Sequence, residues 1–255
     1  MRRFLPLVVL LASACGAGTT DLTTPEPVRG GPAEVDSLYR VAEQYYRHGK
    51  WARAATTLER LVFEFPPGDP RVARTHFLIA ESYFASNDHL RAAREFRKVS
   101  DETPTDPLAP EALLRAGDAY ADLWKRPELD PSYGQTAMAY YQELLNRYPN
   151  APAAARARER LAGLQEKFAV KEYKAAMFYF RYKAWDSAIL YFSDILLNYR
   201  DTRVAPDAAI RLVETYQTLG YVEEQREKCA FIRQYYPGAE GVDQACPAAL
   251  TASTP

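Results

Sequence analysis

The 255-residue sequence has little of what marks catalytic, nucleic-acid-binding or membrane-spanning proteins. It carries 32 Lys and Arg against 33 Asp and Glu, and this balance disfavours a general nucleic-acid binder, which normally has a basic excess. No apolar run reaches the roughly 18–20 residues that a membrane-spanning helix needs. The three histidines are scattered, and no phosphate loop, Gly-x-Ser-x-Gly or Cys–His arrangement occurs. The sequence therefore predicts no enzyme, no metal site and no cofactor.

What the chain does contain is a repeated residue pattern. In residues 35–66, small, aromatic and large residues follow one another at intervals of three, nine, four and eight, and they are Ala42, Tyr45, Ala54, Leu58 and Pro66. Small residues let two helices approach closely, large ones fill the space between them, and Pro ends the second helix. This is the skeleton of a tetratricopeptide repeat, a pair of packed helices.

Four more segments keep this spacing. They are Ala80, Tyr83, Ala92, Phe96 and Pro104; Gly117, Tyr120, Ala137, Tyr141 and Pro149; Ala176, Tyr179, Ala188, Phe192 and Arg200; and Val213, Tyr216, Gln225, Cys229 and Pro237. The third segment fits only with an eight-residue insertion around residues 125–133, and the fifth has lost both small residues. The sequence predicts an all-α superhelical solenoid of five tetratricopeptide repeats, with the insertion in a loop.

The N-terminal segment 1–15 is typical of a secretory signal, with two arginines before an apolar run. It ends in ASAC, which resembles a bacterial lipobox that would make Cys15 the lipidated residue, although Ala12 stands where Leu is usual. The alternative is an ordinary signal peptide cut near Ala14. Gly16, in place of Asp, favours a lipid-anchored protein on the periplasmic face of the outer membrane, where each buried methylene contributes about 0.8 kcal/mol.

The rest of the chain divides by composition and repeat phase. We expect a flexible tether at 16–32, repeats one and two at 33–110, repeat three with its insertion at 111–168, repeats four and five at 169–240, and a tail at 241–255. Between Ala153 and about Tyr182, apolar residues keep helical spacing without a Pro or a Gly pair, which predicts one helix of about 30 residues. This helix would join the N-terminal and C-terminal halves.

Two cysteines remain besides Cys15. A bridge between Cys229 and Cys246 would pin the tail over the end of the solenoid and stabilise it by about 3 kcal/mol. The alternative is a buried, inert Cys229 and a free Cys246. The residues alone leave both open.

The concave groove of such a solenoid is lined by about positions 2, 5, 9, 12 and 13 of each first helix. In repeats one and two these positions include Tyr39, Glu43, Tyr46, Arg47, Arg74, Phe77, Glu81 and Phe84. Four aromatic rings beside two arginines would suit an extended peptide with aromatic side chains and a terminal carboxylate. The alternative is that the rings pack against neighbouring helices.

The later repeats supply different groove residues. Repeat three offers only Leu114, Asp118 and Ala121, so the aromatic groove would be confined to the N-terminal half. Repeat four is aromatic again, with Tyr173 and Phe180 as a candidate second partner surface.

The signal, the tether and the five repeats together resemble the BamD family of outer-membrane protein assembly factors. The similarity includes WARAATTLERLVFEFP, the insertion KRPELDPSYGQTAMAYYQELLNRYPNAP, and KEYKAAMFYFRYKAWDSAILYFSDILLNYRDT. The insertion is the most specific part, since generic tetratricopeptide proteins lack it. Arg200 in place of Pro, the eroded fifth repeat and the lipobox depart from the family pattern.

The resemblance implies a scaffold in the β-barrel assembly machine. The C-terminal repeats would hold a POTRA domain of BamA, beside other lipoproteins of the machine, and the N-terminal repeats would recognise the aromatic-ended signal of unfolded outer-membrane proteins. Trp185 and Tyr191 join Tyr173 and Phe180 as candidate BamA contacts, and packing within repeat four explains them equally well. Two other functions stay open: a different envelope lipoprotein that coordinates cell division or cell-wall synthesis, and a periplasmic chaperone.

Overall fold

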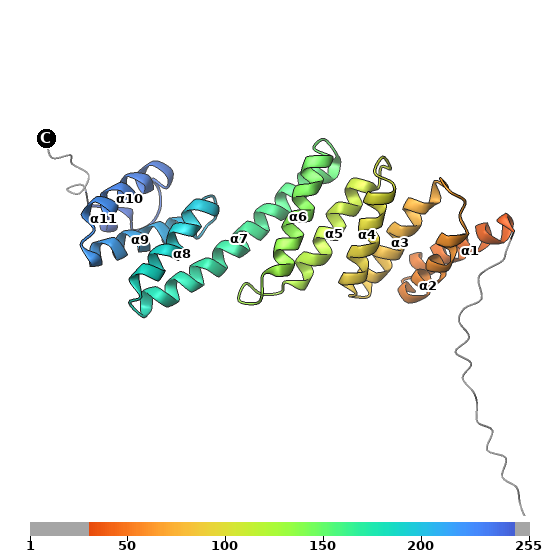
Figure 1. Ribbon diagram of the computed structural model, residues 1–255, viewed down its shortest axis with the longest axis horizontal. Coiled ribbons are helices and arrows are strands. Elements are labelled where there is room, and N and C mark those ends of the chain that lie inside the picture. Colours follow the sequence, from red (N-terminus) through yellow and green to blue (C-terminus); the bar gives the residue numbers. More distant parts are fainter. Residues whose placement is uncertain (1–30, 248–255) are drawn as a thin grey trace, which may run out of the picture.

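The computed structural model describes residues 31–247, and in that range every regular element is a helix. The helices follow one another as pairs, and a short helix closes the C-terminal end (Figure 1). The pairs are α1 (Pro32–Arg47) and α2 (Trp51–Leu61), α3 (Arg71–Ala85) and α4 (His89–Glu102), α5 (Ala109–Leu123) and α6 (Ser132–Arg147), α7 (Pro152–Arg181) and α8 (Trp185–Asn198), and α9 (Ala205–Leu219) and α10 (Val222–Tyr235). The 3₁₀ helix η1 (Val62–Glu64) follows α2, and α11 (Val242–Ala245) follows α10.

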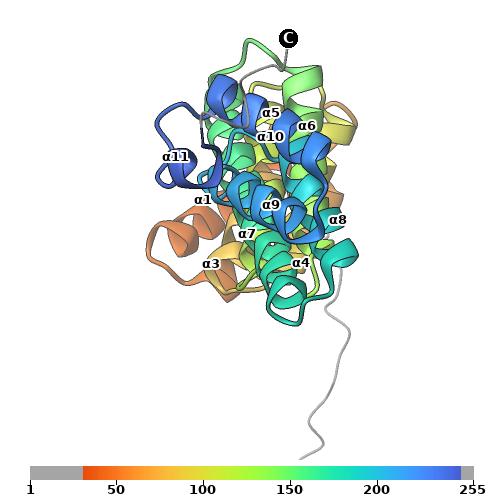
Figure 2. The same cartoon turned by 90° about the vertical axis from the view of Figure 1, so that its left-hand side faces the viewer.

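The pairs stack into an elongated array, and Figure 2 views this array from its C-terminal end. Each helix packs on the helices before and after it in the chain. The all-α fold is confirmed, and the pairs fit the predicted number of repeats.

The small residues of the repeat pattern lie where paired helices meet. Ala42, Ala54, Ala80 and Ala92 are all 0% exposed. Any larger side chain there would push the two helices of a pair apart. The small positions of the sequence pattern therefore mark the contacts between paired helices.

Helix α7 is 30 residues long, as the unbroken apolar periodicity predicts. It runs obliquely between the two halves of the array in Figure 1. It packs against α5 and α6 on one side, where Phe168 belongs to the core of repeat three, and against α8 and α9 on the other, where Ala176 belongs to the core of repeat four. One continuous helix thus serves two hydrophobic cores.

The insertion forms the loop between α5 and α6, and it folds back onto α7. Trp124 at its start is 1% exposed, and its ring centroid lies 4.4 Å from that of Phe168. The Lys167 side chain donates a hydrogen bond to the Trp124 carbonyl, and Lys171 Nζ lies 3.4 Å from the Leu129 carbonyl oxygen. The loop is thereby fastened to the helix that links the two halves.

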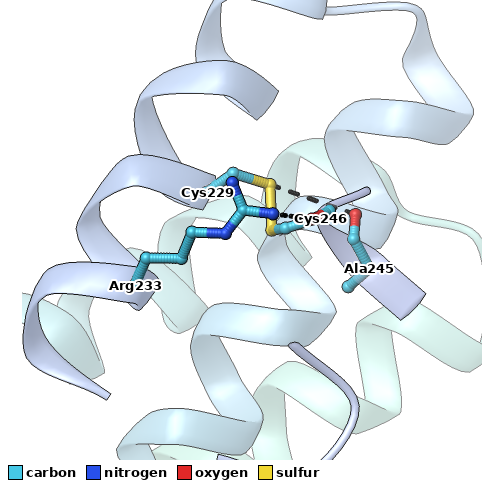
Figure 3. Close-up of a disulfide and its surroundings, with 4 residues drawn as sticks. All are labelled: Cys229, Arg233, Ala245 and Cys246. Atoms are coloured by element: carbon cyan, nitrogen blue, oxygen red, sulfur yellow. Dashed lines mark hydrogen bonds between the residues drawn. A yellow bond between two sulfur atoms is a disulfide. The ribbon is translucent and has the colours of Figure 1, made fainter. Parts of the chain in front are cut away.

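The C-terminal cap is closed by a disulfide between Cys229 and Cys246, whose Cα atoms are 5.4 Å apart (Figure 3). Of the two alternatives that the sequence leaves open, the structure contains the bonded one. Within the segment predicted as a tail at 241–255, residues 242–245 form α11. The bridge joins α10 to the residue directly after α11.

Residues 1–30 and 248–255 lie outside the described range, and with them the signal segment, Cys15 and most of the predicted tether. Across 31–247, none of the helices combines the length and the apolar character required to cross a membrane.

Candidate functional site

The four rings predicted to line the N-terminal groove are all half-buried, two on α1 and two on α3. Each also contacts a ring of a neighbouring element. The centroid distances are 6.1 Å for Tyr39–Phe65, 5.2 Å for Tyr46–Trp51, 5.3 Å for Phe77–Phe96 and 4.9 Å for Phe84–His89. The rings therefore pack against neighbouring elements and still present part of their surface to solvent.

The two phenols of this set remain neutral at physiological pH. Burial, helped by Glu43, raises the pKa of Tyr39, and burial, helped by Glu81, raises the pKa of Tyr46. Arg74 acts on both phenols in the opposite direction, which places its charge close to each. Two neutral hydroxyls and one guanidinium thus share this surface between α1 and α3.

Arg115 of α5 is a groove residue that the position count missed. Its guanidinium lies 4.1 Å from the centroid of the Phe84 ring, and its Nε donates to Glu81 Oε1 at 2.7 Å. Burial opposes the charge of Arg115, but the hydrogen bonds to Glu81 outweigh this and raise its pKa. Glu81 is therefore occupied by an internal partner, and its role is to hold α5 against α3 and to keep Arg115 over the ring.

The groove position predicted at Leu114 is wrong. Leu114 is 2% exposed and belongs to the core that α7 covers with Ala153, Ala154 and Ala157. The count assumes a free concave face, whereas in repeat three the first half of α7 packs on α5.

Asp118, the next position in repeat three, is occupied by internal partners. It accepts a hydrogen bond from the Tyr141 hydroxyl at 2.9 Å and one from Arg160 Nε at 3.2 Å. Ala121 is half-buried. Repeat three therefore contributes little to a ligand surface.

Two cations remain available beside the rings. Arg47 at the end of α1 and Arg74 near the start of α3 are both exposed, and neither forms an ion pair within residues 31–247. Glu43 on the same face is half-buried. An anion that reached this surface would meet unpaired guanidinium groups next to exposed ring edges.

The candidate residues of the C-terminal half form one aromatic cluster in repeat four. The Tyr179 and Tyr191 rings stack at 5.3 Å, and Phe180 meets Trp185 edge to face at 5.5 Å. Tyr173 lies 6.0 Å from Phe192. Packing within the repeat thus accounts for part of each side chain, and all four candidates remain half-buried rather than buried.

A more exposed apolar surface lies close to this cluster and was not predicted. Phe178 and Tyr182 at the end of α7 are 50% and 73% exposed, and Leu190 and Leu197 on α8 are 67% and 79% exposed. The Phe178 and Tyr182 rings are in contact, with centroids 4.7 Å apart, and contiguous exposed apolar side chains are typical of protein-contact surfaces. These residues stand outside the repeat pattern, so the spacing gave no signal for them.

The histidines do not form a metal site in the described part of the chain. His76 Nδ1 lies 2.8 Å from Glu95 Oε2, a contact between α3 and α4 that the sequence did not indicate. Among residues 31–247, no group of three or more His, Cys, Asp or Glu side chains is placed to hold a metal ion.

The chain resembles several known proteins. A family model described as "YfiO: Outer membrane lipoprotein" matches residues 32–230. Outer membrane protein assembly factor BamD of Vibrio cholerae is 27% identical over 196 residues, which cover 73% of this chain and 81% of the relative. The BamD of Caulobacter vibrioides is 22% identical over 237 residues, or 93% of this chain and 77% of the relative. A solved tetratricopeptide protein of Thermus thermophilus, 18% identical, covers 85% of this chain and 98% of its own at a TM-score of 0.36, too low to support an argument.

Proposed function

Since the family model covers most of its length, the chain belongs to the YfiO family of outer membrane lipoproteins, and we propose that it acts as a non-enzymatic scaffold in outer-membrane protein assembly, as its BamD relatives are named to do. The proposal has three parts: a peptide groove, a partner surface and a lipid anchor. Each is tested separately.

The groove part rests on the four half-exposed rings of α1 and α3 beside Arg47 and Arg74, which form no ion pair within residues 31–247. We propose that this surface captures the terminal strand of an unfolded outer-membrane protein. An aromatic side chain of that strand would pack on the exposed edges of Tyr39, Tyr46 and Phe77, and its terminal carboxylate would pair with Arg74 or Arg47. The unpaired state of the arginines is the observation that carries this assignment.

The partner part rests on the aromatic cluster of repeat four and the exposed side chains around it. We propose that Tyr173, Phe180, Trp185 and Tyr191 lie within or beside a surface that holds a POTRA domain of BamA, and that other lipoproteins of the machine bind the same scaffold. The exposed Phe178 and Tyr182 support this placement, because they would be covered by a partner. Anchoring through lipid on Cys15 would keep the scaffold on the periplasmic face of the outer membrane.

The partner part is tested by purifying the tagged protein from its own outer membrane in mild detergent and identifying co-purified proteins by mass spectrometry. We expect a POTRA-bearing barrel protein in near-equal amount. Recovery of cell-wall synthases without that barrel protein would contradict the proposal and favour an envelope coordinator. Absence of lipid on Cys15, read by mass spectrometry of the same sample, would contradict the anchor and favour a periplasmic chaperone.

The groove part is tested with a synthetic peptide that ends in Phe, prepared with a free and with an amidated C-terminus. We expect Arg74→Gln with Arg47→Gln to weaken binding of the free-acid peptide at least tenfold, because a charge-assisted hydrogen bond contributes about 1.5–3 kcal/mol. The matched control is Arg94→Gln, an exposed arginine on α4. Equal binding of the amidated and free-acid peptides would show that the terminal carboxylate is not recognised. Unchanged peptide binding after replacement of all four rings with Ala, at Tyr39, Tyr46, Phe77 and Phe84, would show that the peptide does not bind in this groove.

A further inference from the structure

The repeat positions counted for the N-terminal groove also occur in repeat five, where their chemistry differs. Val213 stands in repeat five where Ala42 stands in repeat one, so the groove positions of α9 are Asp207, Ile210, Glu214 and Gln217. These four side chains line a hollow of about 510 Å³, together with Tyr173 of α7. The hollow therefore lies at the positions of repeat five that correspond to the aromatic positions of repeats one and two.

One wall of this hollow is formed by residues 240–245, from which Glu240 and Gln244 line the hollow. Gly241, at φ +83°, turns the chain into α11 against Ile210; the Ile210 Cδ1 atom would lie 3.8 Å from a Cβ built on this glycine. The disulfide to Cys229 and a hydrogen bond from Arg233 to the Cys246 carbonyl hold the end of the wall to α10 (Figure 3). A helix of four residues has little stability of its own, so the wall depends on this bridge.

The charges that face the hollow are mostly negative. Among the lining residues in the described part of the chain, the only cation is Arg211, which pairs with Glu214 at 2.6 Å. Within the described residues, neither Asp207 nor Glu240 forms an ion pair. Within residues 31–247, two carboxylates are thus left without an ion-pair partner, next to the Tyr173 ring and to Ile210, which is 9% exposed. The combination suits an organic cation on a flexible stem, since the stem can lie on Ile210 and Tyr173 while the charge reaches the carboxylates.

We propose that this hollow binds lysine or arginine side chains of an extended segment of a partner protein, and that the Cys229–Cys246 bridge builds the wall it needs. The proposal goes beyond the function proposed above, because it concerns a hollow of repeat five and a ligand of opposite charge. It holds or fails independently of the aromatic groove.

The experiment measures fluorescence anisotropy of a labelled peptide, acetyl-Gly-Arg-Ser-Arg-Gly-amide, with the full oxidised chain. The same peptide with citrulline in place of arginine is the ligand control. We expect Asp207→Asn with Glu240→Gln to weaken arginine-peptide binding at least tenfold. The matched protein control is Glu159→Gln with Asp186→Asn, which removes the same charge from exposed sites on α7 and α8 and should leave binding unchanged. The proposal would be contradicted if the two double variants weakened binding equally, or if the citrulline peptide bound as tightly as the arginine peptide. Either result would indicate non-specific attraction.

The wall is tested with Cys229→Ser and Cys246→Ser together, for which we expect loss of arginine-peptide binding with retained binding of the Phe-ended peptide at the N-terminal groove. Binding as tight as that of the unaltered chain would overturn the dependence on the disulfide. Gln244→Arg keeps the bridge and places a cation inside the hollow, so it should compete with the peptide and also abolish binding. Arg74→Gln should leave arginine-peptide binding unchanged, which separates this site from the proposed peptide groove.

Discussion

At the scale of single residues, the third repeat depends on a glycine that makes room for a buried ring. A Cβ on Gly117 would lie 2.4 Å from Cε1 of Tyr141, a residue that is 0% exposed and whose hydroxyl is bonded to Asp118. The ring is held at both ends and has no space to move into. We expect Gly117→Ala to destabilise the protein by about 1–3 kcal/mol, as measured by urea unfolding.

Gly163 offers the matched control for this change. It lies inside α7, and a Cβ there would meet nothing within 4 Å. Gly163→Ala should stabilise the protein by about 0.5–1 kcal/mol, because alanine loses less backbone entropy in a helix. Destabilisation by both changes would contradict the assignment of the Gly117 effect to the Tyr141 ring.

A second residue-scale prediction concerns alkaline pH. Burial, followed by the hydrogen bond that its hydroxyl donates to Glu59, raises the pKa of Tyr83 to about 12. An unfolded tyrosine has a pKa of about 10, so between pH 10 and 12 the unfolded chain loses this proton first and the folded state loses stability. The free energy of unfolding of Tyr83→Phe, measured with urea, should fall less steeply between pH 10 and 12 than that of the unaltered chain. Parallel curves would show that Tyr83 does not carry the effect.

Residue positions could be predicted where spacing alone decides them. Tyr39 and Phe77 lie half-exposed on the first helices because their repeat positions place them there. Arg115 could not be found in this way, because its long side chain reaches the groove from a position that the count does not include. Leu114 was misplaced because burial by α7 is a property of the fold and not of the repeat.

At the scale of elements, the insertion loop is organised by lysines of α7 at helical spacing. Lys167 bonds to the Trp124 carbonyl and lies 4.6 Å from the Trp124 ring centroid, and Lys174 pairs with Glu128. We expect Lys167→Met to speed amide hydrogen exchange across residues 125–131 several-fold while the helices keep their protection, as measured by mass spectrometry.

The control for this change is Lys174→Met. Its ion pair is about half exposed on both sides, so its loss should change exchange in the loop less. Equal effects of the two changes would contradict the view that the buried end of the loop, at Trp124, determines its order.

The elements were predictable to different degrees for physical reasons. The helix pairs and the 30-residue α7 follow from apolar periodicity, and within residues 31–247 Pro stands only in turns or in the first two positions of a helix. Helix α11 has four residues, too few for a periodic signal, and it is held by a covalent bridge between residues 17 positions apart. The sequence contains the two cysteines, but it does not determine whether they are bonded to each other.

At the scale of the whole molecule, the array couples neighbours only, since each helix packs on the next. The disulfide should contribute about 3 kcal/mol for a loop of this length, and its effect should remain local. On reduction we expect faster hydrogen exchange in α10 and α11, with exchange in α1–α6 unchanged. Faster exchange along the entire chain would show that the array unfolds as one unit.

The length of α7 has a consequence for any single polypeptide that touches both halves. Thirty helical residues extend about 45 Å, whereas an extended chain advances about 3.3 Å per residue. About 14 residues are therefore needed to run the length of this helix, more than the roughly 9–11 residues of one transmembrane β-strand. A polypeptide that contacts both ends of α7 at once must therefore be longer than a single transmembrane strand.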